Sequence, residues 1–352
     1  MTAAAAAAQA PTLDNSKFRE VGTQNPGAKD PAPASGRTIG DYSPRYQPTS
    51  KGEQDPDLYS LNRLFKDSHG DFMAKRERYV APIELSARVL PNQRIQHEPG
   101  SFDLFGYDID VDLPVLVSTD GYLKFGAYYE GRSYTFSSAF GTKGNASGIG
   151  DEQLHAAGVH VGFGVFLDDN VLFEMETSPG LWSDWDDGLH HKDFDFPSKA
   201  LFTFHAIDNV FLKVGARYNQ VYEDAPWLPY LGVSWHVFDG MRFDLLAPEY
   251  VELSLWPSAS TGILIGGEVT GAQYHVRTTE ATGSQRADVQ VQEIIAYVGL
   301  VHRMNDNMSL RARSGLVVAG DYHLTTGAAS FNETEGALDQ GFFAELSFGI
   351  DF

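Results

Sequence analysis

Apolar and polar residues alternate with a period of two from Pro82 to the end of the chain. Between residues 83 and 89, for example, isoleucine, leucine, alanine and valine alternate with glutamate, serine and arginine. Successive side chains of a strand point to opposite faces, so this pattern predicts strands with one apolar and one polar face. The recurrence of charges on one face predicts an antiparallel sheet with one wet side. The same alternation covers residues 105–113, 123–130, 158–165, 210–219 and 309–318.

The connections between these segments are alternately short and long. Short turns rich in Asp, Asn, Ser and Gly fall at residues 118–121, 168–170, 208–209, 238–240, 257–260 and 305–307, and longer polar stretches at 135–151, 177–196, 278–288 and 320–340. This is the pattern of a transmembrane antiparallel up-and-down β-barrel. Six short turns join twelve strands, and one further strand at each end makes fourteen. An even number places both termini on the short-turn, periplasmic side. A count of twelve is the alternative, because residues 241–256 could form one strand bent at Pro248.

Residues 1–78 have a different composition from the rest of the chain. They are rich in Pro, Gly, Ser, Asn and Gln, which predicts a largely disordered periplasmic segment. Within it, Leu58, Leu61, Leu64 and Phe65 recur at helical spacing and predict a short amphipathic helix near 57–79. Residues 1–10 end like a secretory signal but lack a basic start, so a signal remnant and a low-complexity alanine tail both stay open.

Charge and composition exclude several classes of function. The chain of 352 residues has 26 Lys and Arg against 47 Asp and Glu, a net charge of −21, and the whole excess of acidic residues lies after residue 78. Nucleic-acid binding needs clustered basic residues, so we exclude it. The absence of cysteine excludes disulfides, thiolate metal sites and Cys nucleophiles. No run approaches the ~18 apolar residues that a membrane helix requires.

The last strand carries a family resemblance. Residues 341–352 alternate again and end in Phe352. This segment resembles the assembly signal of bacterial outer-membrane β-barrels, which implies recognition by the barrel-assembly machinery and contact with outer-membrane lipid. Residues 241–249, 252–256 and 262–268 are similar to a family of outer-membrane barrels of unknown function, a resemblance that implies no activity and no catalytic residue. Together with the strand and loop pattern, the resemblance to outer-membrane barrels covers residues 82–352 and implies a bacterial outer-membrane location.

If the apolar face meets lipid, the polar face lines the lumen. The strand pattern assigns both acids and bases to this face, with acids in excess, which predicts an aqueous path with mild cation preference. The alternative is a network of mutually paired ions that fills the barrel. A barrel of about fourteen strands is intermediate in size between barrels filled by side chains and barrels with an open channel. The predicted pore-lining residues are Arg88, Asp108, Asp110, Asp112, Lys124, Glu130, His160, Glu174, Lys213, Arg217, Arg242, Asp244, Glu252, Glu268, Arg311, Arg313 and Glu345.

Other candidate chemistry is weak. The loop at 182–195 carries several Asp and two adjacent His, but it lacks the spacing of a calcium loop, and adjacent residues on a strand point apart. Ser, His and acidic residues show no catalytic spacing. We therefore expect no catalytic residue, no metal site and no cofactor.

These observations predict an outer-membrane barrel that acts as a passive pore for small solutes or as a structural protein of the outer membrane. A protein that binds an envelope or periplasmic partner through residues 1–78 or its surface loops is the alternative. An outer-membrane hydrolase is a third, less favoured reading.

Overall fold

The structure is a computed structural model. It describes residues 68–76, 78, 80–96, 101–118, 120–137, 152–185, 188–219, 226–280, 283–326 and 333–351. The first unit of the chain, residues 1–37, and residues 38–67 therefore lie outside the described part, together with most of the predicted disordered segment.

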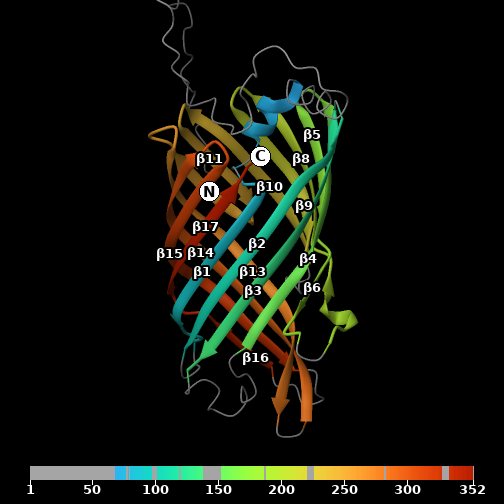
Figure 1. Cartoon of the computed structure of the whole chain (residues 1–352), viewed down its shortest axis with the longest axis vertical. Coiled ribbons are helices and arrows are strands. Elements are labelled where there is room, and N and C mark those ends of the chain that lie inside the picture. The colour runs from blue at the N-terminus through green and yellow to red at the C-terminus, as the bar shows by residue number, and fades with distance from the viewer. Residues whose placement is uncertain are drawn as a thin grey trace, which may run out of the picture. The chain divides into compact units, whose positions relative to one another are not determined.

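A closed ring of fourteen antiparallel strands forms the wall (Figure 1). Each strand pairs with its neighbours, and β1 closes the ring by pairing with β17 from Ile83↔Ile350 to Val89↔Ala344. The sequence prediction of fourteen strands is thus confirmed. The wall strands are β1 (Ile83–Gln93), β2 (Phe102–Val117), β3 (Gly121–Phe136), β4 (Glu152–Asp168), β5 (Val171–Thr177), β8 (Ser198–Ile207), β9 (Val210–Tyr218), β10 (Trp227–Phe238), β11 (Met241–Ala247), β12 (Tyr250–Leu255), β13 (Thr261–Glu280), β14 (Gly283–Asn305), β15 (Met308–Thr326) and β17 (Gly341–Ile350).

The alternative of twelve strands is wrong. A turn at Pro248 and Glu249 separates β11 from β12, and the two strands pair with each other from Met241↔Leu255 to Leu246↔Tyr250. A strand bent at Pro248 would leave these residues unpaired with one another.

The long connections hold more structure than the polar pattern predicts. The connection between β5 and β8 contains β6 (Gly180–Ser183), the 3-10 helix η2 (His191–Asp193) and β7 (Phe194–Asp195). The stretch 278–288 lies mostly within β13 and β14, which pair as far as Glu280↔Gly283. The short β16 (Glu333–Ala337) pairs with the far end of β15. The sequence of these strand ends is polar, so composition alone does not separate them from loops.

The wall is uneven in height. β13 and β14 have 20 and 23 residues, whereas β11 and β12 have 7 and 6. The hairpin of β13 and β14 therefore extends past the neighbouring wall at the long-loop end, the lower end in Figure 1. The short turns lie at the opposite end, where β17 ends and where a helix over residues 68–75 contacts the wall (Figure 1).

The outer face of the wall is apolar. Val89 and Phe105 are 42% and 49% exposed, while their inward neighbours Leu90 and Leu104 are buried. The same alternation continues around the ring, with Val214, Leu300 and Leu346 exposed on distant strands. An apolar outer band around a closed wall is the arrangement that spans a lipid bilayer. Among the described residues, no helix is long and apolar enough to cross a membrane.

Candidate functional site

The predicted pore-lining residues share the inner face of the wall. Each of the seventeen side chains is buried or half-buried, and each alternates along its strand with residues of the outer face. On β1, for example, Arg88 lies between the exposed Ala87 and Val89. The structure thus brings these residues together around one interior. Whether they line a pore stays a prediction.

Many of the interior charges form ion pairs, some between neighbouring strands, some along one strand and some across an intervening strand. Arg132 contacts Asp108 at 2.7 Å, and Lys124 contacts both Asp112 at 2.6 Å and Glu176. Similar pairs join Arg242 to Asp244 at 2.6 Å, Arg217 to Glu249 at 3.4 Å and Arg311 to Glu84 at 3.5 Å, while the imidazole of His160 lies 2.9 Å from Asp110. Such pairing neutralises much of the charge that the pattern assigns to an aqueous lumen.

Two clusters of charges join strands that are not neighbours in the ring. The Arg88 guanidinium on β1 reaches Glu293 on β14 at 2.7 Å, although β15 and β17 lie between these strands. Arg313 on β15 contacts Glu268 on β13 at 2.9 Å and Glu345 on β17 at 2.6 Å. Removing one partner of such a buried pair strongly destabilises the fold, because the other charge is left without compensation. They act as cross-links across the interior.

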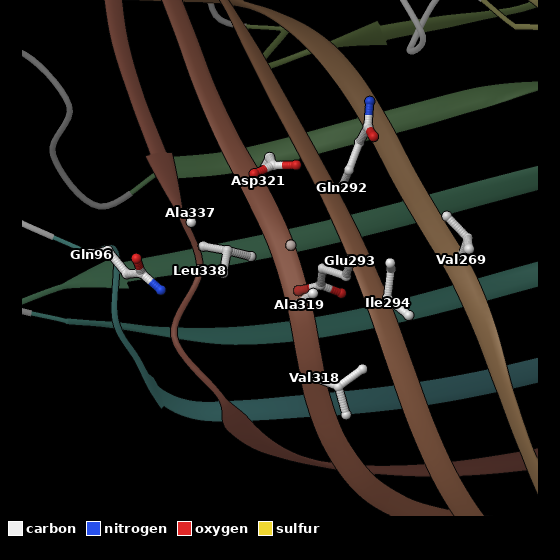
Figure 2. A pocket seen from close by; sticks show the side chains of 11 residues that line it. Gln96, Val269, Gln292, Glu293, Ile294, Val318, Ala319, Asp321, Ala337 and Leu338 are labelled. Atoms are coloured by element: carbon white, nitrogen blue, oxygen red, sulfur yellow. The ribbon is translucent and has the colours of Figure 1, made fainter. Parts of the chain in front are cut away.

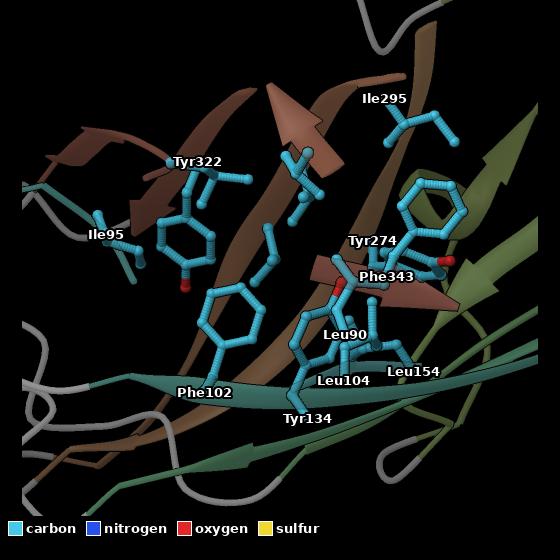
Figure 3. Packing of buried hydrophobic residues seen from close by; sticks show 14 of the residues in the cluster. Leu90, Ile95, Phe102, Leu104, Tyr134, Leu154, Tyr274, Ile295, Tyr322 and Phe343 are labelled. Carbon is cyan, nitrogen blue, oxygen red and sulfur yellow. The ribbon is translucent and has the colours of Figure 1, made fainter. Parts of the chain in front are cut away.

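The long-loop half of the interior contains an apolar core (Figure 3). Leu90, Leu104, Tyr134 and Tyr274 are nearly inaccessible to solvent and belong to one cluster, and the Tyr274 hydroxyl donates a hydrogen bond to Glu130 across the interior. The sequence prediction of a polar inner face is therefore wrong for this half. The inward positions of β1 and β2 change from charged to aliphatic and aromatic toward the long loops.

Opposite walls also meet at this end through β6. Ser183 of β6 forms a parallel bridge with His275 of β13, and β6 pairs on its other side with β4 from His155↔Ser183 to Gly158↔Gly180. The connection between β5 and β8 thus joins β4 to β13, strands that are separated in the ring by the shorter β5 and β8–β12. The interior is consequently narrower here than fourteen equal strands would make it.

At the short-turn end, residues 68–76 and Arg78 lie in the mouth of the barrel. Phe72 packs with Phe166, Leu172 and Phe211, which project inward from β4, β5 and β9. The imidazole of His69 stacks on the Phe166 ring with centroids 3.7 Å apart. This apolar contact holds the helix against one side of the mouth.

Charged groups hold the end of the same segment. Arg76 contacts Glu174 at 2.9 Å, and the Ser234 hydroxyl donates a 2.8 Å hydrogen bond to the Arg76 carbonyl. Arg78 lies 3.7 Å from both Glu252 and Glu268. The segment therefore crosses from β5, past β10, to β12 and β13.

Arg78 stays charged in this position. Burial by itself lowers the pKa of the Arg78 guanidinium, but the carboxylates of Glu268 and Glu252 outweigh burial and hold that pKa above its ordinary value. The guanidinium also lies 4.0 Å above the ring of Tyr250. The contact is therefore that of a permanent cation with an acidic wall.

Sequence reasoning missed several of these residues. Phe72 lies in the predicted helical range but outside its apolar stripe, and the four stripe residues fall outside the described part of the chain. Glu293 stands on an inner face that is otherwise apolar around it, at Val291 and Ile295. A lone acid on an apolar face was the available signal.

The loop at 182–195 offers no metal centre in its described part. Asp193 accepts a hydrogen bond from the His190 backbone N–H at 2.7 Å and so closes the turn before η2. Across all described residues, no group of three or more His, Asp or Glu side chains is arranged to hold a metal ion.

The closed antiparallel wall, its apolar outer face and its charged interior define a barrel of the outer-membrane class. No protein-family model and no curated protein sequence matches the chain.

Several solved structures are similar. The Pseudomonas putida toluene transporter TodX has 9% identity and a TM-score of 0.35, over 77% of this chain and 89% of that one. The translocator domain of the autotransporter NalP from Neisseria meningitidis has 10% identity and a TM-score of 0.32, over 83% and 94%. OccAB4 of Acinetobacter baumannii has 10% identity and a TM-score of 0.27, over 75% and 96%.

Proposed function

We propose that this protein is a bacterial outer-membrane β-barrel, with both termini periplasmic, which passes small solutes when residues 68–78 leave the short-turn mouth. The exposed apolar band supports the membrane location, since such a surface is unfavourable in water. The conformation described here is then the closed one.

The observation that carries this proposal is how residues 68–78 are held. The segment adds no strand to the wall, and side-chain contacts of Phe72, Arg76 and Arg78 hold it in place. The wall ladder does not depend on these contacts, so the segment can leave while the barrel stays closed. Its departure would expose Glu174 and Glu252 at the mouth, which would favour cations.

A purely structural barrel is the second candidate. The apolar core of the long-loop half and the bridge between β6 and β13 support it, because an apolar, narrowed interior opposes the passage of polar solutes. On this proposal the interior stays filled whether or not residues 68–78 are present.

Conductance in planar bilayers tests the two candidates. We expect low conductance from the full chain, low conductance from a control that lacks only residues 1–56, and higher conductance when residues 1–78 are removed. Equal, measurable conductance in all three would reject the proposal that this segment closes the mouth. No conductance in any of them would favour the structural barrel.

Binding of an envelope partner through residues 1–78 stays a separate proposal. Phe72 and Arg76 are docked on the wall, so a partner that binds this part of the segment must compete with those contacts. A pull-down with the full chain, compared with the chain lacking residues 1–78, would test it.

A further inference from the structure

The guanidinium of Arg78 lies in a cage on the inner face of β12 and β13. Its Nη1 atom lies 3.7 Å from a carboxylate oxygen of Glu252 and 3.7 Å from one of Glu268. Its central carbon lies 4.0 Å from the centroid of the Tyr250 ring. Carboxylates and an aromatic face are the groups that proteins use to bind a planar cation. We call Tyr250, Glu252 and Glu268 the cation cage.

The wall strands build this cage, and the segment that carries Arg78 does not. Tyr250 and Glu252 are alternate residues of β12, and Glu268 of β13 is the ladder partner of Tyr250. The Tyr297 hydroxyl on β14 donates a 2.8 Å hydrogen bond to Glu252 Oε2. Gly266 lies between these two residues in the ladder and leaves room for the contact, because a Cβ there would lie 2.8 Å from that hydroxyl. We therefore expect the cage to keep its shape when Arg78 leaves.

Arg78 fills the cage without reaching hydrogen-bond distance. Charge-assisted N–H···O hydrogen bonds are ~2.7–2.9 Å long, and Arg76 lies within this range, 2.9 Å from Glu174. The 3.7 Å contacts of Arg78 are longer. The chain restrains Arg78 from both sides, because Arg76 is paired with Glu174 and β1 begins at Ile83. A free guanidinium has no such restraint and can approach both carboxylates of the cage closely.

Charge favours another cation in the cage once Arg78 leaves it. Glu268 also contacts Arg313 at 2.9 Å and so keeps a cationic partner. Glu252 does not, because in the described part of the chain Arg78 is the only basic side chain within 4.0 Å of its carboxylate. Glu252 is 8% exposed, and a buried carboxylate without a compensating charge is strongly unfavourable.

A second interior carboxylate, Glu293, offers less to a cation. It lies 2.7 Å from Arg88 and lines a pocket of about 270 Å³ at β14 and β15 (Figure 2). Among the described residues that line this pocket, none is aromatic. The Arg88 side chain is 9% exposed, whereas that of Arg78 is 25% exposed, so solvent reaches the cation cage more readily.

We propose that the cation cage binds a small organic cation with a guanidinium group, and that Arg78 is the tethered competitor of this ligand. The planar guanidinium that the cage holds stands in for that ligand. Because the ligand and Arg78 exclude each other, binding of either one weakens binding of the other. The ligand therefore loosens residues 68–76. This consequence rests on the proposed function, because loosening the segment opens a path only if the segment closes the mouth.

Calorimetry on the full chain in phosphatidylcholine nanodiscs tests the cage. The variant is Arg78→Ala, and the probe is ethylguanidinium, which replaces the atoms that this substitution removes. N-ethylurea is the uncharged counterpart of similar shape, and empty nanodiscs give the background. We expect saturable binding of ethylguanidinium to one site in Arg78→Ala and at least tenfold weaker binding to the wild type. Equal affinity in the two proteins, or equal affinity for the two probes, would overturn the proposal.

Further substitutions in Arg78→Ala locate the binding. Glu252→Gln should weaken ethylguanidinium binding about tenfold or more, as expected for the loss of a hydrogen bond between charged groups. Tyr250→Leu removes the aromatic face and keeps both carboxylates, so it carries the test if Glu252→Gln does not fold. Glu84→Gln is the matched control, because Glu84 is an interior carboxylate on β1 that pairs with Arg311 at 3.5 Å, outside the cage. Unchanged affinity in every cage variant that folds would reject the site.

Proteolysis of the wild type tests the competition. Ethylguanidinium at a saturating concentration should speed chymotrypsin cleavage after Phe72, measured by mass spectrometry, and N-ethylurea should not. An unchanged cleavage rate at saturation would show that the ligand does not compete with Arg78.

These readouts separate the cage from the proposed function, because neither depends on conductance. If ethylguanidinium binds while removal of residues 1–78 leaves conductance unchanged, the cage stands and the closing segment is rejected. If that removal raises conductance while Arg78→Ala binds no ethylguanidinium, the closing segment stands and the cage is rejected.

Discussion

At the scale of single residues, the face on which a side chain stands decides what it contacts. Val214 is 43% exposed on the outer face of β9. The next residue, Gly215, faces the interior, where a Cβ would lie 2.1 Å from the carbonyl oxygen of Ala200. The outer face thus meets lipid, while the inner face has no room for a side chain at this point.

Val214→Arg should lower the free energy of unfolding by about 2–4 kcal/mol, the penalty for a lipid-facing arginine near the bilayer midplane. Urea titration of the protein in lipid vesicles, followed by tryptophan fluorescence, measures this change. Asp306→Arg in an exposed turn is the control and should stay within about 0.5 kcal/mol of the wild type. Equal effects of the two substitutions would contradict the placement of β9 in the bilayer.

At the scale of elements, the helix over residues 68–75 depends on the wall. A helix this short is marginal in water by itself and needs packing for stability. Phe72 provides that packing, with 7% exposure, and Arg76 is 9% exposed beside Glu174. Contacts of two kinds, apolar and ionic, thus hold one short element.

Phe72→Ser should release this element and expose Arg76 to trypsin, while the barrel stays folded. Limited trypsin digestion followed by mass spectrometry should show faster cleavage after Arg76 than in the wild type. Lys75→Gln is the control, because the Lys75 ammonium forms an exposed pair with Asp71 at 2.9 Å, and such pairs contribute little. Wild-type protection in Phe72→Ser would show that the apolar contact does not hold the helix.

At the scale of the whole molecule, closure of the ring determines stability. β1 and β17, which lie at opposite ends of the described wall sequence, pair over seven residues each. A closed sheet has no edge strand and satisfies its backbone hydrogen bonds within the wall. All wall strands lie between Ile83 and Ile350, so closure does not require residues 1–78.

The folded barrel should therefore resist unfolding by SDS without heating and migrate faster than the boiled protein on a gel. The chain lacking residues 1–78 should show the same shift, because its wall is complete. Loss of the shift in that variant would mean that the wall needs the segment in the mouth in order to fold.

Alternation of side chains along each strand predicts which residues face the interior, and this is the part of the site that the sequence can predict. The inward position of Arg88 or Arg313 can be read from its strand neighbours, since side chains alternate strictly along a strand. Their partners cannot be read this way. Glu293 lies 205 residues from Arg88 in the chain, and only closure of the ring brings the two side chains to 2.7 Å.

Local alternation and turn residues are enough to predict the class of fold, the fourteen wall strands and the two faces of the wall. What fills the interior depends on contacts that form only in the folded barrel. The apolar core around Tyr134 and Tyr274, the bridge from Ser183 to His275 and the docking of Phe72 each join segments that are far apart in the chain. Their positions depend on strand number, tilt and stagger around the closed ring, and a local pattern does not contain these quantities.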